Sequence, residues 1–307
     1  MSMNWKTKLV LLFAKLQKPI SVEDGVDIMA LRKKSSNASK LGVKLFDKNV
    51  NIATTYDAIA NGVPVRIYKN SEAKNQRVIV FYHGGGFVLY DVSSHDNCCR
   101  KLCKMNNSIV VSVDYRLAPE YPFPAAHEDA FTALQWVREN AEQLGANAND
   151  MIVAGDSAGG NLAACMAHRC RKENIPLKGQ VLVYPWIDGK LNNPSIETNG
   201  EGYLLEKRTM FWFQQQYTPR PEDHCVPEVS PCYEKDFTGL APAFILTAAY
   251  DPLLDDGVNY FQQLKTAGIK ATYKCYPELF HGFFNIPGID PVAIQSYTDI
   301  QLFLAEL

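Results

Sequence analysis

The fold is decided by the stretch Met151-Ile-Val-Ala-Gly155-Asp156-Ser157-Ala158-Gly159-Gly160-Asn161-Leu162. Its apolar start is typical of a buried strand, its glycines end that strand, and a helix-like run follows. In this context Gly-x-Ser-x-Gly holds a serine on a sharp, strained turn with its hydroxyl in the open. The amide of Ala158 would then lie at a helix amino terminus, which favours a developing oxyanion. Taken alone the pattern is weak, because glycine is also the default residue of loops.

Apolar runs alternate with helix-like segments on both sides of this stretch. Continuous Val, Ile and Leu runs predict strands buried on both faces, and their alternation with helices implies parallel pairing. We therefore expect an α/β fold in which a mostly parallel central sheet has helices on both faces. The expected strands are 78–82, 109–115, 151–155, 180–184, 243–249 and 271–276, and the expected helices are 94–106, 125–144, 159–173, 253–267 and 291–306.

The chain before these strands has two other patterns. Residues 4–18 and 23–40 place apolar residues at helical spacing, so they predict two helices. Residues 50–59 and 63–69 alternate apolar and polar side chains around an Asn-Gly pair, which predicts an antiparallel hairpin. Because the two helices precede every strand, we expect them to lie over the domain.

One interval breaks the alternation. Between Trp186 and Pro242 there is no convincing strand; residues 191–202 are polar and glycine-rich, and 204–217 predict a helix with several aromatic residues. A long excursion after a strand end is a candidate lid. Its aromatic residues could equally well pack the insertion onto the core. The residues that we expect to line a substrate pocket are Phe87, Tyr90, Tyr203, Phe211, Trp212 and Phe283.

Three further segments follow strand ends, where ligands bind in a sheet of this kind. The loop His83-Gly84-Gly85-Gly86-Phe87 has no side chains at three positions, so its amides could approach a substrate oxygen. No Gly-Lys-Ser/Thr follows it, which disfavours a phosphate loop. Asp251 and His281 each come after an expected strand. The chain order Ser, Asp, His is one in which such a triad occurs.

Each of these residues also has a simpler interpretation. Asp251 could only cap the helix that begins near Pro252, and His281 could be structural. Asp255 and Asp256 are alternative acids, although they fall inside the following helix. What favours the catalytic interpretation is that serine, aspartate and histidine occur together, in order and at strand ends.

The composition is that of an ordinary globular protein. With 307 residues, of which 47% are hydrophobic and 21% charged, the chain suits one α/β domain with an insertion. A net charge of -2 gives no electrostatic footprint for nucleic acid. The apolar run 9–14 is too short to span a bilayer, so we expect no stable membrane insertion.

Cysteine usage indicates the compartment. The eight cysteines follow no export signal, and the core needs no covalent support, so we expect free thiols and a cytoplasmic protein. His95, Cys98, Cys99 and Cys103 lack the spacing of a closed zinc site. We therefore expect neither a metal nor a cofactor.

Together these motifs resemble the hormone-sensitive-lipase-like esterases of the α/β-hydrolase superfamily. The resemblance covers residues 78–307. Two positions depart from it, because Tyr90 and Leu254 stand where many members have a small residue and an arginine. The motifs that carry it are His83-Gly-Gly-Gly-Phe87, Tyr115-Arg-Leu-Ala-Pro-Glu120, Phe123-Pro-Ala-Ala126 with Glu128-Asp129, Gly155-Asp-Ser-Ala-Gly-Gly-Asn161, Asp251-Pro252 and His281-Gly-Phe283.

The resemblance implies an α/β-hydrolase fold with a two-part helical cap. Residues 1–45 and 189–220 would form the cap, and 46–188 and 221–307 the core. It implies that Ser157 is the nucleophile, Asp251 the acid and His281 the base. The oxyanion hole would consist of the amides of Gly84, Gly85 and Ala158.

The function implied is that of a serine hydrolase, a carboxylesterase that cleaves esters of short to medium acyl chain through an acyl-enzyme. Its partner would be a small hydrophobic ester, and no oligomeric state is predicted. Two alternatives stay open. One is a non-catalytic small-molecule receptor on the same fold, and the other is a deacetylase or amidase that uses the same triad.

Overall fold

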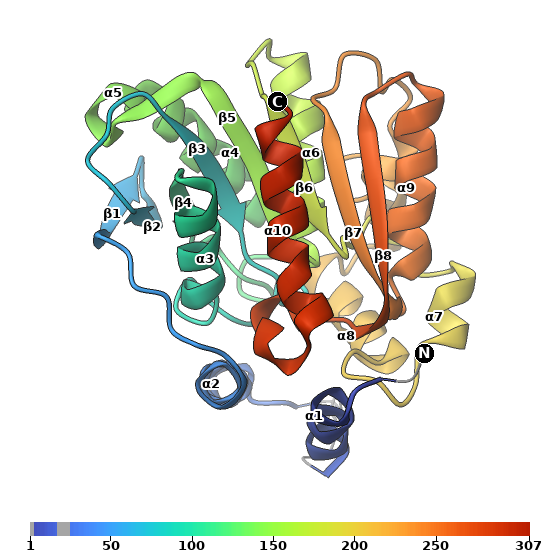
Figure 1. Ribbon diagram of the computed structural model, residues 1–307. Helices are drawn as coiled ribbons and strands as arrows, with labels where there is room; N and C mark the ends of the chain where they lie inside the picture. Colours follow the sequence, from blue (N-terminus) through green and yellow to red (C-terminus); the bar gives the residue numbers. More distant parts are fainter. Residues whose placement is uncertain (1–2, 17–24) are drawn as a thin grey trace.

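A computed structural model describes residues 3–16 and 25–307. One eight-stranded sheet runs through the molecule in the order β1-β2-β4-β3-β5-β6-β7-β8 (Figure 1). The strands are β1 Thr54–Ala60, β2 Val63–Lys69, β3 Gln76–Tyr82, β4 Ile109–Val113, β5 Ala146–Asp156, β6 Gly179–Val183, β7 Ala243–Tyr250 and β8 Ala271–Phe280.

The sheet is mostly parallel, as expected. From β4 onward, the strands β4, β3, β5, β6, β7 and β8 pair parallel with one another, whereas β2 pairs antiparallel with both β1 and β4. The expected hairpin is confirmed as β1 and β2. Its turn uses Asn61 and Gly62 at positive φ (48° and 98°), a conformation that an Asn-Gly pair adopts readily.

Helices cover both faces of the sheet, as expected. α3 and α10 pack with one hydrophobic cluster, and α4, α6 and α9 pack with the other (Figure 1). In the described part of the chain, the α-helices are α1 Trp5–Leu16, α2 Ile28–Phe46, α3 Asp96–Asn106, α4 Ala125–Glu139, α5 Ala141–Leu144, α6 Ala158–Lys172, α7 Pro194–Thr198, α8 Lys207–Tyr217, α9 Leu254–Thr266 and α10 Pro291–Ala305.

The interval after β6 differs most from expectation. The polar stretch 191–202 contains α7, which we did not predict, and the expected helix 204–217 begins only at Lys207. α7 is held by the start of α9, because the amide of Ser195 donates to Asp255 (2.8 Å) and its hydroxyl donates to the carbonyl of Pro252 (2.6 Å). These contacts join residues about sixty positions apart, so local sequence does not reveal them.

The amino-terminal helices α1 and α2 lie beyond the carboxyl ends of the parallel strands (Figure 1). Arg32 of α2 donates to the carbonyls of Val88 and Ala118, both at 2.8 Å, and forms an ion pair with Glu120. Residues 17–24, where one expected helix ends and the other begins, lie outside the described residues. No helix in the described ranges has the length and apolar character needed to cross a membrane.

Candidate active site

Ser157 occupies the sharp turn between β5 and α6. Its φ of 57° and ψ of -118° lie in a region that non-glycine residues rarely adopt. The neighbouring glycines are required by close packing, since a Cβ at Gly159 would lie 1.9 Å from the carbonyl oxygen of Tyr82. A Cβ at Gly155 would lie 2.1 Å from the carbonyl oxygen of Gly159. Bare backbone on both sides therefore lets the strained turn form.

The structure brings Ser157, His281 and Asp251 together. The Nε2 atom of His281 lies 2.9 Å from the Ser157 hydroxyl oxygen, and its Nδ1 atom lies 2.7 Å from a carboxylate oxygen of Asp251. Asp251 is fully buried, and its other oxygen accepts a bond from the amide of Leu253 (2.8 Å). β8 extends to Phe280, so His281 directly follows a strand end. This hydrogen-bonded line can move a proton from the hydroxyl to the imidazole.

The two alternative acids have other partners. Asp256 accepts bonds from the amides of Ile187 (2.8 Å) and Asp188 (2.9 Å) and from the side chain of Asn193 (2.7 Å). Burial raises its pKa to about 7. Asp255 caps α7 through Ser195. Both carboxylates therefore anchor the interval after β6 to α9.

The structure corrects one expected oxyanion donor. The amide of Gly84 donates to the carboxylate of Asp156 (2.9 Å), so the expectation that it would bind an oxyanion is wrong. In the described part of the chain, the amides of Gly85, Gly86 and Ala158 have no hydrogen-bond acceptor. Gly85 and Gly86 have φ values of 121° and 61°, which glycine adopts without strain. Gly86 was missed because nothing in the sequence shows which amide Asp156 occupies.

Asp156 links two loops behind the serine. Besides Gly84, it lies 3.2 Å from the Nε2 atom of His95 and accepts a bond from the side chain of Asn285 (3.2 Å), four residues beyond His281. Burial alone would raise the pKa of Asp156, but His95 and the Gly84 amide outweigh it and hold that pKa below its usual value. The charged carboxylate thereby fixes both ends of the β3–α3 loop, at Gly84 and His95, to the loop after His281.

The cysteines near His95 have no arrangement for metal. Cys98 donates its thiol to the carbonyl of His95, and Cys98, Cys99 and Cys103 are all buried. Among the described residues, no group of three His, Cys, Asp or Glu side chains is placed to hold an ion. The packing of α3 accounts for these residues.

α8 packs directly against the glycine loop. The ring of Phe213 lies over Gly86, where a Cβ would come within 2.3 Å of it. Tyr217 stacks on Phe87 with ring centroids 3.8 Å apart, and its hydroxyl lies 2.6 Å from His127 Nε2 on α4. The helix expected to be a lid therefore also supports the loop that carries the free amides.

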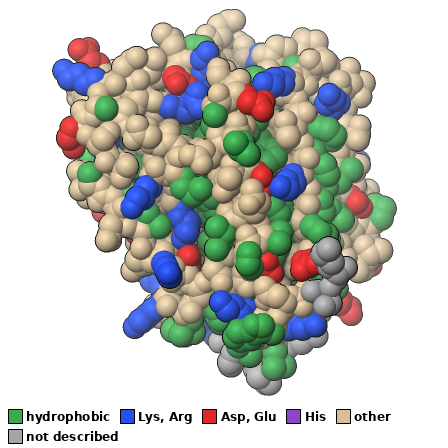
Figure 2. Space-filling model, viewed as in Figure 1, with side chains coloured by type: hydrophobic (Ala, Val, Ile, Leu, Met, Phe, Trp, Pro, Cys, Tyr) green, Lys and Arg blue, Asp and Glu red, His purple; other side chains and the backbone are tan. Residues whose placement is uncertain are grey.

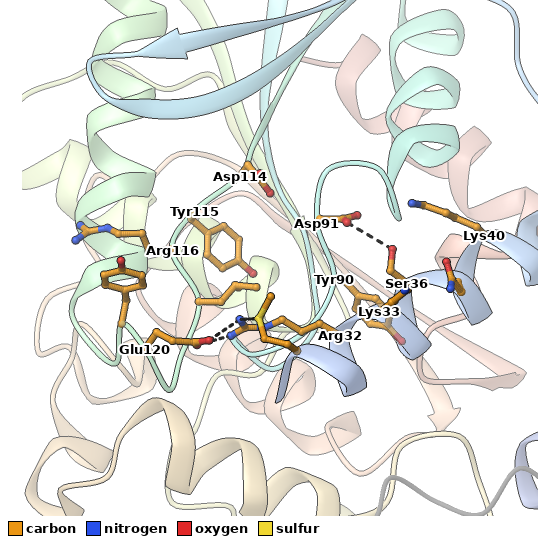
Figure 3. Close-up of a pocket in the computed structure, with 14 residues that line it drawn as sticks. Arg32, Lys33, Ser36, Lys40, Tyr90, Asp91, Asp114, Tyr115, Arg116 and Glu120 are labelled. Atoms are coloured by element: carbon orange, nitrogen blue, oxygen red, sulfur yellow. Dashed lines mark hydrogen bonds and ion pairs between the residues drawn. The ribbon is translucent and has the colours of Figure 1, made fainter. Parts of the chain in front are cut away.

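The six expected pocket residues differ in burial. Phe87 and Phe283 are 1% and 0% exposed, so they pack in the core, and Trp212 is also buried. Tyr203 and Phe211 are half-buried. Tyr90 lines a cavity of about 550 Å³ between α2 and the loops after β3 and β4 (Figure 3). That cavity is bounded by Arg32, Glu120 and Tyr115 among others, and its lining contains no residue of the Ser157 cluster.

Acid should destabilise this fold through its buried histidines. Burial lowers the pKa of His83 and His168 to about 4 and that of His127 to about 3, against 6.5 for an exposed histidine. Below about pH 6.5 the unfolded chain therefore binds protons that the folded chain cannot. Each histidine should cost roughly 1.4 kcal/mol of unfolding free energy per pH unit as the pH falls toward its folded pKa.

Urea unfolding across this pH range measures the effect. The unfolding free energy should fall with acidification. In His127→Gln the slope of the unfolding free energy against pH should be smaller by the contribution of about one bound proton. An unfolding free energy independent of pH between about 6.5 and 4.5 would contradict the assignment of neutral, buried imidazoles.

Comparison with known proteins finds a matching family and similar esterases. A family model described as alpha/beta hydrolase fold matches residues 79–285. The chain is 36% identical to esterase LipI of Mycobacterium tuberculosis over 282 residues, 90% of this chain and 87% of that protein. It is 38% identical to ethyl acetate hydrolase of Pseudomonas putida, covering 74% of this chain and 73% of that one. A hyperthermophilic esterase from Pyrobaculum calidifontis superimposes with a TM-score of 0.92 at 35% identity, covering 99% and 98% of the two chains.

Proposed function

Because the chain belongs to the alpha/beta hydrolase fold family, among its hormone-sensitive-lipase-like esterases, we propose that it is a carboxylesterase that acts through an acyl-enzyme on Ser157. The observation that carries this proposal is the hydrogen-bonded line from Asp251 through His281 to Ser157. The names of the relatives support ester cleavage, and this line supplies a nucleophile and a base at the required distances.

The first half of the reaction forms the acyl-enzyme. The Ser157 oxygen attacks the ester carbonyl carbon while Nε2 of His281 takes the hydroxyl proton. The Nδ1–H of His281 donates to Asp251, which holds the tautomer that leaves Nε2 free as a base. The carbonyl oxygen becomes an oxyanion, which the amides of Gly85, Gly86 and Ala158 stabilise. The ester bond then breaks, and the alcohol leaves with the proton from His281.

The second half releases the acid. Water attacks the acyl carbonyl and gives a proton to His281, which returns it to the Ser157 oxygen as the acyl bond breaks. Carboxylic acid and free enzyme are the products. Gly84 has a positioning role here, because its bond to Asp156 keeps the following two amides aimed at the reaction centre.

We propose that the cap has two parts, α1 with α2 and the segment 189–220. α1 and α2 lie at the end of the sheet where the strands meet Ser157 and His281, and α8 touches the glycine loop (Figure 1). Phe213 and Tyr217 hold α8 against that loop, and Arg32 holds α2 to the carbonyls of Val88 and Ala118. A cytoplasmic location is supported by the eight free thiols.

The substrate class should be small or medium hydrophobic esters. The aromatic residues of α8 close one side of the glycine loop, and a relative is named ethyl acetate hydrolase. We expect kcat/KM for a series of p-nitrophenyl esters to be highest at short to medium acyl length. A maximum with long-chain emulsified triglyceride would contradict the assignment.

The same triad could cleave amides or acetyl groups, and the fold could bind without catalysis. A receptor would need no base, whereas His281 is present and bonded to both partners. Rates on an ester and on the amide with the same acyl group separate the remaining alternatives. We expect the ester to be cleaved faster; a faster amide would reassign the chain to the amidases.

A further inference from the structure

The overall charge of -2 hides an uneven distribution along the chain. The first 48 residues contain ten of the 31 lysine and arginine residues but only four of the 33 aspartate and glutamate residues. α1 and α2 themselves contain no acidic residue at all. The rest of the chain is correspondingly acidic, so α1 and α2 carry a concentrated positive charge.

The outer face of α2 combines lysine and leucine. Lys33, Lys40 and Lys44 are exposed at helical spacings of seven and four, which places them in one stripe along the helix. Leu41 and Leu45, one turn apart and next to this stripe, are 52% and 65% exposed. The lysines have no ion-pair partner among the described residues.

α1 presents apolar residues outward too. Trp5 and Leu12 are 70% and 54% exposed, with exposed Lys8 on the same stripe at spacings of three and four. With Met29, Leu41 and Leu45 of α2, they make up five of the eleven large hydrophobic residues exposed among the described residues. Figure 2 shows hydrophobic side chains and lysine or arginine side chains together at the end of the molecule formed by α1 and α2.

We propose that the outer faces of α1 and α2 dock the enzyme onto an anionic phospholipid surface. Helices that lie in a membrane interface combine a strong positive charge with tryptophan and leucine, because lysines meet lipid phosphates while apolar side chains enter the acyl boundary. Nucleic acid would also attract the lysines, but its phosphate backbone offers nothing to exposed Leu41, Leu45 and Trp5. The mixture of charge and apolar surface therefore favours lipid over other polyanions.

This surface is attached to the reaction centre. Arg32 of α2 donates to the carbonyl of Val88, just after the glycine loop, and Asn4 beside α1 donates to the carbonyl of Ile289 (3.0 Å), eight residues beyond His281. Docking would thus hold the carboxyl ends of the strands toward the lipid, where hydrophobic esters are concentrated. No part of the chain needs to cross the bilayer, since the helices lie on its surface.

Vesicle flotation with the full-length enzyme tests the proposal. We expect the chain to float with vesicles of phosphatidylcholine and phosphatidylglycerol, to float poorly with phosphatidylcholine alone, and to be released by added salt. Lys33→Gln/Lys40→Gln/Lys44→Gln should weaken binding roughly 100-fold, because each basic residue near an anionic surface contributes a factor of about five. Leu41→Ala/Leu45→Ala should also weaken it while leaving the charge unchanged.

The matched control replaces three exposed lysines at the opposite end of the sheet. Lys74, Lys178 and Lys270 precede the amino ends of β3, β6 and β8, so their triple glutamine variant should bind vesicles like the wild type. All variants should keep wild-type activity on a soluble ester. The proposal is overturned if the wild type ignores anionic vesicles at low salt, or if both lysine triples lose binding equally.

A second copy of the chain is the other occupant that the experiment distinguishes. If the enzyme alone is a dimer in solution that Leu41→Ala/Leu45→Ala converts to a monomer, the surface is a subunit interface and the lipid proposal fails. Flotation does not depend on catalysis, so Ser157→Ala should bind vesicles normally whether or not ester hydrolysis is the activity.

Discussion

Ser157→Ala should lower kcat on a soluble chromogenic ester by a factor on the order of 10⁶, since removing the nucleophile of such a triad leaves only binding and the oxyanion amides. Ser157 is the only hydroxyl that the structure places at Nε2 of His281 within the described residues. Alanine fits the turn as well as serine does, so the loss should come from chemistry and not from folding. Steady-state hydrolysis of p-nitrophenyl acetate measures it.

The matched control is Ser71→Ala. Ser71 lies between β2 and β3, at the opposite end of the sheet from Ser157, and among the described residues its hydroxyl hydrogen-bonds only to the side chain of Gln76. This variant should keep the wild-type rate, and both variants should unfold at wild-type urea concentrations. A Ser157→Ala enzyme with even a tenth of the wild-type kcat would require another nucleophile.

Asp251→Asn should lower kcat by roughly 10⁴, the effect of an asparagine that stabilises the wrong imidazole tautomer. The asparagine amide would donate to Nδ1 of His281, which moves the ring proton to Nε2 and removes the base that Ser157 needs. The shape of the site is retained, so KM should change little. Initial rates over a range of ester concentrations separate the two parameters.

Asp255→Asn is the control for this prediction. Asp255 lies only four residues away, but its carboxylate faces the amide of Ser195 in α7. We expect it to cost stability without a comparable loss of kcat. If Asp255→Asn lost activity and Asp251→Asn kept it, the acid would have been assigned to the wrong residue.

Sequence patterns predicted the parts of this molecule that local signals encode. The strands around 78–82 and 151–155 are marked by continuous apolar runs, and glycine turns mark where they end. Gly155 and Gly159, on either side of Ser157, fall where backbone packing leaves no room for a Cβ, so the Gly-x-Ser-x-Gly spacing carries structural information. The expected strands 243–249 and 271–276 also end shortly before Asp251 and His281, which is how the sequence identified these two residues.

The errors concern contacts between distant residues. Gly84 lost its expected role because Asp156, 72 residues later in the chain, accepts its amide proton. α7 forms in a polar stretch because Asp255 and Pro252 cap and anchor it. Phe87, the last residue of the glycine loop, was expected to line the substrate pocket, but Tyr217 and the core cover it. None of these partners is adjacent in sequence, and the type of a side chain alone does not show which distant residue it will contact.

Labelling with a fluorophosphonate tests the central claim most directly, because the reagent bonds covalently to an activated serine oxygen. Peptide mass spectrometry of the labelled full-length chain should find the adduct on Ser157. Ser157→Ala should give no adduct, and His281→Ala should react far more slowly. An adduct on a different residue, or ester hydrolysis that continues while Ser157 stays unlabelled, would contradict the account.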